Sequence, residues 1–125
     1  MKPFALAALA ALLSAPTAAQ EPPALTLEHR MLLRCSAVFA IVAGEQARGA
    51  ASTRAYPPLA ERGREFFVRS SVRLMDDLAL TREQVEASVR AEVEELQEAS
   101  GQAAPARDLD SVMRPCLSAL EASGL

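Results

Sequence analysis

The feature that most constrains this fold is its pair of cysteines, Cys35 and Cys116, the only two in the chain. Cys35 lies in the most apolar stretch beyond the N-terminal segment, residues 27–43, and Cys116 lies near the C-terminus. A redox-active pair needs close spacing such as C-x-x-C, which is absent, so we expect a structural disulfide. Because that bond would close most of the chain into one loop, it would stabilise the fold by about 4 to 5 kcal/mol.

The N-terminal residues 1–19 have the three parts of a secretory signal peptide. Lys2 supplies the positive charge, residues 4–13 form an apolar run, and Thr17 and Ala19 are small enough to precede a cleavage site. The run is shorter than the roughly 18 apolar residues of a transmembrane helix. We therefore expect cleavage after Ala19, no transmembrane segment in the mature chain, and a periplasmic or secreted location.

The predicted mature chain, residues 20–125, is long enough for one domain with a modest core. Lys2 is the only lysine, and such exclusive use of arginine beside many alanines is typical of a GC-rich bacterium. The 13 basic residues less Lys2 stand against 16 acidic ones, which gives the mature chain a net charge of about −4. A negative exported chain is a poor candidate for binding nucleic acid.

Hydrophobic periodicity predicts four helices and no strand. An extended tail over residues 20–26, which holds two prolines, precedes a first helix that Thr26 can cap and that ends between Gly44 and Gly49. The apolar positions of this helix are Leu27, Met31, Cys35, Val38 and Val42, widened by Leu32, Phe39 and Ile41. Because the helix is apolar nearly all round, we expect neighbours to bury it on more than one side.

A second helix is predicted from Pro57 and Pro58 to Leu78. Its buried side is marked by Leu59, Phe66, Phe67, Leu74, Met75 and Leu78. Gly63, on or near that side, either allows a close helix contact or simply weakens the helix. Six arginines between Arg48 and Arg73 give this region an excess of positive charge. We expect ion pairs with Glu65, Asp77 and the acidic third helix to balance this charge.

The capping box formed by Thr81 and Gln84 predicts the start of a third helix, which should end near Ser100 and Gly101. Its narrow apolar stripe, typical of an outer helix, consists of Val85, Val89, Val93 and Leu96. Residues four apart on its solvent side are expected to form ion pairs: Arg82, Glu86, Arg90 and Glu94. The glutamates crowded at its end, Glu92, Glu94, Glu95 and Glu98, are best explained as a solvated face, with a basic partner or Ca²⁺ as the alternative.

The last helix is predicted after a linker of residues 101–106, with Asp108 or Asp110 as its cap. Its apolar residues are Leu109, Val112, Met113, Cys116, Leu117 and Leu120. Pro115 falls inside this pattern, so the helix either begins one turn earlier or is kinked there. The sequence thus predicts an all-α, small four-helix bundle-like domain over residues 27–125, with a disulfide joining the first and last helices.

The chain offers few groups for catalysis. His29 is the only histidine, which removes most metal sites and any catalytic triad, and on a helix it lies about 120° away from the face of Cys35. The adjacent Asp76 and Asp77 point about 100° apart and are a poor acid–base pair. We therefore expect no enzymatic activity, no metal and no cofactor.

The leading functional hypothesis is a non-enzymatic exported protein that binds another protein. In size, predicted compartment and cysteine count the chain is similar to small exported helical proteins with one disulfide, among them acid-stress chaperones and periplasmic immunity proteins. Aromatic and arginine side chains dominate binding hot spots, so the candidate surface consists of Arg62, Phe66, Phe67, Arg69 and Arg73. The alternatives are a carrier of a small apolar ligand or lipid between helices and, as a variant of the first, an acid-activated chaperone. The sequence leaves a homodimer open.

Overall fold

The computed structural model describes residues 23–102 and 105–125, and within these ranges the chain is all-α, with no strand. The elements in chain order are α1 (Leu27–Ala47), the short 3-10 helix η1 (Ala51–Thr53), α2 (Ala60–Leu78), α3 (Arg82–Gln102) and α4 (Pro105–Ala122). The predicted four-helix, all-α domain is confirmed. The predicted signal peptide and residues 20–22 of the predicted tail lie outside the described residues. Among the helices that are described, none has the length and apolar character needed to cross a membrane.

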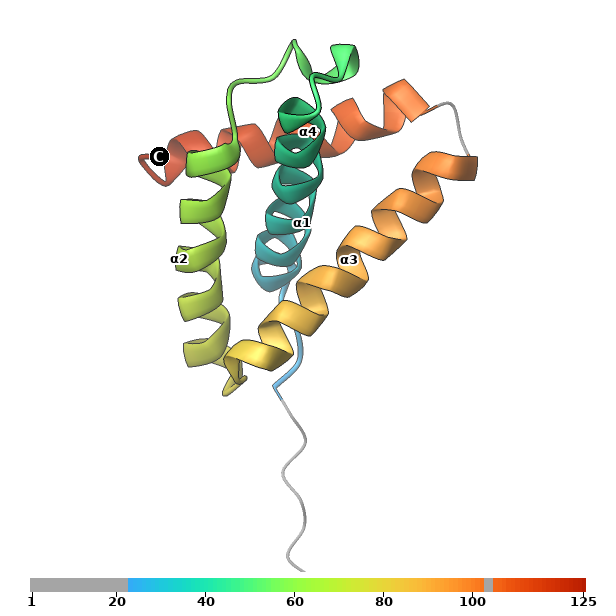
Figure 1. Ribbon diagram of the computed structural model, residues 1–125. Coiled ribbons are helices and arrows are strands. Elements are labelled where there is room, and N and C mark those ends of the chain that lie inside the picture. Colours follow the sequence, from blue (N-terminus) through green and yellow to red (C-terminus); the bar gives the residue numbers. More distant parts are fainter. Residues whose placement is uncertain (1–22, 103–104) are drawn as a thin grey trace, which may run out of the picture.

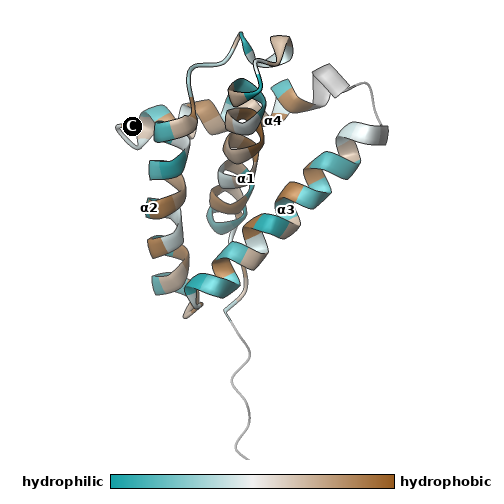
Figure 2. Ribbon diagram, in the orientation of Figure 1, coloured by the Kyte–Doolittle hydropathy of each residue, from teal (hydrophilic) through white to brown (hydrophobic). Residues whose placement is uncertain are grey.

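The helix α1 lies at the centre, and α2, α3 and α4 each pack against it (Figure 1). α2 runs alongside α1, α3 leans away from α2 toward its own C-terminal end, and α4 crosses behind (Figure 1). Residues 35–39 are five consecutive buried residues, more than one full turn, so α1 is covered on every side at this level. Figure 2 shows the strongly apolar middle of α1 that predicted this central position.

The disulfide between Cys35 and Cys116 is present and joins α1 to α4 as predicted. Both cysteines are buried, at 1% and 2% exposure, in the larger of two core clusters. That cluster also contains Phe39, Met113 and Leu120. The bond therefore lies within the packed core and fixes the crossing of the first and last helices.

The start of α1 carries a capping box that the sequence indicated only in part. Thr26 is the N-cap as predicted, and its hydroxyl accepts a hydrogen bond from the His29 backbone N–H at 3.2 Å. The His29 ring completes the box, because its Nδ1 accepts from the Thr26 N–H at 3.2 Å. The third residue of such a box is usually Glu or Gln, so a histidine there gave no signal.

The prediction that Leu27 and Met31 are buried is wrong, since they are 77% and 37% exposed. The α1 residues that share the larger core cluster with α4 begin at Cys35. Leu27 therefore lies outside this cluster, whereas Met31 lies at its edge, where it lines a small hollow with Cys35 and Pro115 of α4. The hydrophobic periodicity identified the correct face of α1, but it could not show how much of the length of α1 the other helices bury.

The helix α2 begins at Ala60, later than the two prolines suggested, and ends at Leu78 as predicted. The side chain of Gln46 explains the late start, because it forms hydrogen bonds with the backbone of the residues that precede α2. Its Nε2 donates to the Pro57 carbonyl at 2.8 Å, and its Oε1 accepts from the Leu59 N–H at 3.0 Å. The end of α1 thereby sets the start of α2.

The capping box of α3 is confirmed, since Thr81 and Gln84 exchange hydrogen bonds of 2.8 and 3.2 Å. The predicted linker over residues 101–106 is wrong, because α3 continues to Gln102 and α4 begins at Pro105. Asp108 and Asp110 therefore lie inside α4 and do not cap it. Proline is well tolerated in a first helical turn, which makes the early start possible. Pro115 lies inside the helix.

Candidate binding groove

The second and third helices are joined at one end and diverge from there (Figure 1). At the joined end a small core cluster packs α2 and α3 against α1; its buried members are Leu33, Leu74, Leu78 and Val85. Beyond this cluster one face of α1 carries Ser36, Ala40, Ala43 and Ala47, spaced four, three and four residues apart. Ala40 is exposed although it directly follows the five buried residues. Along this strip of small side chains Ser36 is buried, Ala43 is half-buried, and Ala40 and Ala47 are exposed.

This strip forms part of an apolar groove with a volume of about 300 Å³. The groove is lined from α1 by Ser36, Phe39, Ala40 and Ala43, from the α2 side by Leu59, Ala60, Gly63, Arg64 and Phe67, and from α3 by Val89. A second hollow of about 520 Å³ shares Ala43, Leu59 and Ala60 with it and reaches the η1 loop. From Ser36 to Ala47 the floor extends roughly 16 Å along α1, about three helical turns.

Gly63 sets how closely α2 approaches α1 beneath the groove. A β-carbon at this position would lie 3.1 Å from the Cβ of Phe39, tighter than ordinary van der Waals contact. Phe39 in turn meets the ring of Phe66 edge-on, with centroids 5.3 Å apart. Of the two interpretations of Gly63, the structure supports the close helix contact.

The hydroxyl of Ser36 is the unusual polar group of this groove. Ser36 is 3% exposed, and its Oγ has no hydrogen-bond partner among the described residues. Four other helical serines donate to the backbone carbonyl four residues earlier: Ser71, Ser88, Ser100 and Ser118. An unpaired buried hydroxyl costs free energy in the unliganded protein. A ligand in the groove that paired with Ser36 would recover that energy.

Arg64 is the one charged residue that lines the groove. It makes no ion pair or hydrogen bond with any residue in the described part of the chain. The groove therefore combines apolar walls, a buried hydroxyl and an available cation. This combination suits an apolar ligand that carries an acceptor and a carboxylate.

The five residues predicted as a partner-binding surface are not brought together on one open face. Phe66 is 5% exposed and lies in the core, while Phe67 is partly buried and lines the groove. Arg62 donates to the Leu125 carbonyl, and Arg69 donates to Glu65 and to the Ser123 carbonyl, both at 3.1 Å. These two arginines bind the carbonyl-rich end of α4 to α2.

The fifth residue, Arg73, belongs to a polar cluster that joins α2 to the start of α1. It pairs with Asp77 and lies 3.6 Å from Glu28. The Nε2 of His29 lies 3.0 Å from the Asp77 carboxylate. Since Nδ1 of His29 accepts from the backbone, Nε2 carries the proton and donates to Asp77. The only histidine is therefore a structural link between two helices.

The His29 and Arg73 contacts lower the pKa of Asp77 below its ordinary value of 3.8, with the His29 hydrogen bond as the larger cause. A carboxyl group whose pKa is lower in the folded than in the unfolded state stabilises the fold at pH values above its unfolded-state pKa. This stabilisation is lost as the pH falls through the folded-state pKa. We expect Asp77→Asn to lower the urea midpoint at neutral pH, with a deficit that shrinks below about pH 4. Asp76→Asn is the control, because Asp76 is exposed and its carboxylate makes no hydrogen bond or ion pair with the described residues. A deficit of equal size at every pH would contradict this assignment.

The sequence predicted that the acidic part of α3 pairs with the arginines of α2, but among the described residues its ion pairs are with Arg34 of α1. Arg34 of α1 lies 3.6 Å from Glu92 and 3.8 Å from Glu95. Burial, then the charge of Glu95, raises the pKa of Glu92. Within the described ranges none of the predicted pairs among Arg82, Glu86, Arg90 and Glu94 comes within ion-pair distance.

The described residues contain no group of three or more His, Cys, Asp or Glu side chains that could hold a metal ion. Comparisons of the chain with protein-family models, with curated proteins and with solved structures find no match.

Proposed function

We propose that this is an exported, periplasmic protein that acts without catalysis by binding a helix of another protein in the groove between α2 and α3. The observation that carries the proposal is the uncovered face of α1, where Ser36, Ala40 and Ala43 form the floor of an apolar groove. Small side chains let two helices approach closely, and helix-in-groove recognition places an apolar helix face in such a channel. Export is supported by the signal-peptide pattern and is compatible with the disulfide.

The dimensions and polar groups of the groove define what the partner helix would carry. A floor of about three turns accommodates apolar anchors at positions i, i+4 and i+7 of the partner. A carboxylate beside the groove would pair with Arg64, and a hydrogen-bond acceptor at the floor would pair with the Ser36 hydroxyl. Of the five residues predicted from the sequence as a partner-binding surface, Phe67 is the one that lines the proposed site.

The second candidate function is a carrier of a small apolar ligand, which the apolar lining of the same groove favours. Ligand sites usually enclose most of their ligand in about 300 to 1,000 Å³. This groove is at the small end of that range and opens into the hollow beside η1, so it suits a helix face better than an enclosed lipid.

The proposal is tested by a crosslinking pull-down from the native periplasm with the mature, oxidised protein. Ala40→Trp fills the groove from an exposed position and should abolish capture of the partner. Ala87→Trp, on an exposed position of α3, is the matched control and should retain it. Retention of the same partner by Ala40→Trp would show that the groove is not the site. A co-purifying apolar molecule with no protein partner would favour the carrier.

A stability measurement gives a second check on the Ser36 hydroxyl. We expect Ser36→Ala to raise the free energy of unfolding by about 1 kcal/mol, because it removes an unsatisfied buried hydroxyl and favours the helix. The same variant should bind the partner more weakly. Ser118→Ala is the control, since Ser118 is exposed and its hydroxyl is bonded to Arg114, so only a few tenths of a kcal/mol are expected. If Ser36→Ala destabilised the protein in urea, the hydroxyl would be satisfied after all.

A further inference from the structure

We propose that, in the absence of a partner, a second copy of this chain occupies the groove with the outer face of its own α2. Self-association would then compete with partner binding for one surface. This inference rests on the proposed function in that it takes the same groove as the binding surface. Its test is the oligomeric state, which can fail or succeed independently of any partner.

The apolar complement to the groove lies on the helix that forms its wall. Val68 and Val72 are 49% and 54% exposed, and they follow each other by one turn on α2. Phe67, beside them in sequence, lines the groove. One region of the molecule therefore offers both an apolar groove and an apolar ridge, which is what a self-complementary contact requires.

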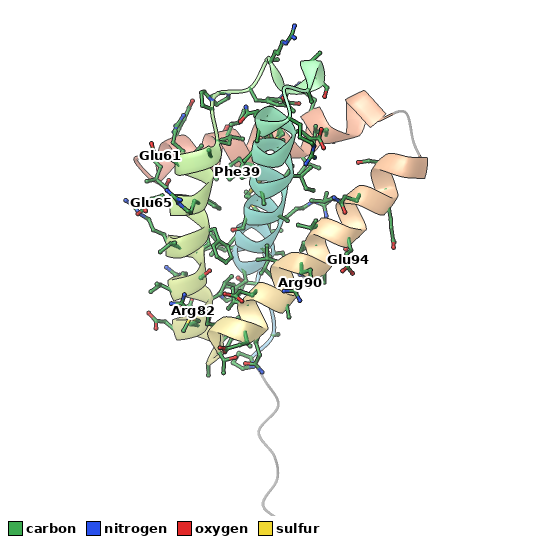
Figure 3. The ribbon with its side chains drawn as sticks, in the orientation of Figure 1. Phe39, Glu61, Glu65, Arg82, Arg90 and Glu94 are labelled. Carbon is green, nitrogen blue, oxygen red and sulfur yellow. A yellow bond between two sulfur atoms is a disulfide. The ribbon has the colours of Figure 1, made fainter. Side chains whose placement is uncertain are left out.

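The charges near the groove are also self-complementary. Arg64 and Glu61 lie one turn apart on α2, and neither makes an ion pair with a described residue. Arg90 and Glu94, which are labelled on α3 in Figure 3, likewise have no ion-pair partner in the described ranges. Both signs are thus available on each copy. A second α2 in the groove would bring Glu61 to the Arg64 of the first copy, and the reverse pair would form by symmetry.

The other exposed apolar side chains fit the groove less well. Leu27 precedes Ser36 by nine residues, which places the two on opposite sides of α1. If Leu27 and Met31 of one copy filled the groove of the next, the first copy would keep a free groove and the second its free Leu27 and Met31, so the contact would propagate into open chains. Of these two surfaces, the α2 ridge beside the groove is the one that allows a closed dimer.

The contact is small, since the groove accommodates about three helical turns. Interfaces below about 1,200 Å² are typical of weak association. We therefore expect a reversible dimer with a dissociation constant of roughly 10 µM to 1 mM. At low concentration the groove would be open to a partner.

Sedimentation equilibrium of the mature, oxidised protein over ~1 µM to ~1 mM measures this directly. We expect a monomer–dimer equilibrium, with Val72→Asp and Ala40→Trp each raising the dissociation constant at least about tenfold. Leu27→Asp, which places the same charge at an equally accessible apolar position, should leave it unchanged. Circular dichroism of each variant confirms that the fold is kept.

Several outcomes would overturn the inference. A protein that stays monomeric up to ~1 mM does not pair through this surface. Open-ended polymers would show a contact other than the α2 ridge. A dimer that responds to Leu27→Asp but not to Val72→Asp would use the opposite side of α1. In each case partner capture, with its dependence on Ala40, remains a separate measurement of the proposed function.

Discussion

Replacing both cysteines, Cys35→Ala together with Cys116→Ala, is expected to lower the free energy of unfolding by about 4 to 5 kcal/mol. The bond spans 81 residues, and a loop of this length loses much entropy when its ends are joined in the unfolded chain. Small domains typically have only 5 to 15 kcal/mol of stability in total. The substitution should therefore remove from about a quarter to nearly all of that stability, with α4 the helix most directly affected.

Urea unfolding followed by circular dichroism measures this loss. The matched comparison is the wild-type protein with and without reductant. Because both cysteines are almost fully buried, reductant should act on the wild type only when the core opens, so reduction should accelerate steeply with urea. A double variant within about 1 kcal/mol of wild type would mean that core packing alone fixes α4 in place.

Phe39→Ala is expected to lower the free energy of unfolding by about 3 to 5 kcal/mol, the second largest effect. Phe39 is fully buried, meets Phe66 edge-on and lies against Gly63 where α2 comes closest to α1. Its removal would leave a cavity between the two helices, directly under the groove. The surrounding backbone has little freedom to collapse into it, because Cys35 nearby is fixed by the disulfide.

The control for this substitution is Phe67→Ala, which removes a ring of the same size from the groove wall. Since Phe67 is only partly buried, we expect a loss of about 1 to 2 kcal/mol, together with weaker capture of the partner. Thermal or urea unfolding of the two variants under one condition separates them. Equal losses would place Phe67 in the core and remove it from the proposed site.

The features that followed from the sequence are those fixed by local chemistry. The capping box of Thr81 and Gln84 and the apolar middle of α1 are short-range patterns. The chain has only two cysteines, so one intramolecular disulfide was possible. One of the errors concerns where one helix stops covering another. Leu27 and Met31 share a face with Cys35, but neither belongs to the buried cluster that joins α1 to α4.

The candidate groove depends on tertiary geometry, which explains why the sequence did not reveal it. Ala40 and Ala43 look like ordinary helix-forming residues in the sequence, and only the divergence of α2 and α3 turns them into a floor. Ser36 likewise looks like any helical serine until its hydroxyl is found buried without a partner. Phe66 and Phe67 are adjacent and equally apolar, yet one fills the core and the other lines the opening.

The disulfide also closes the chain into a covalent ring that begins in the third turn of α1 and ends in the last part of α4. A protease that cuts once within this ring, for example in the exposed loop that carries Arg54, opens the backbone without separating its pieces. The two fragments would stay linked through Cys35 and Cys116 and would run apart only on a reducing gel. A single nick within such a ring therefore leaves one covalently connected molecule.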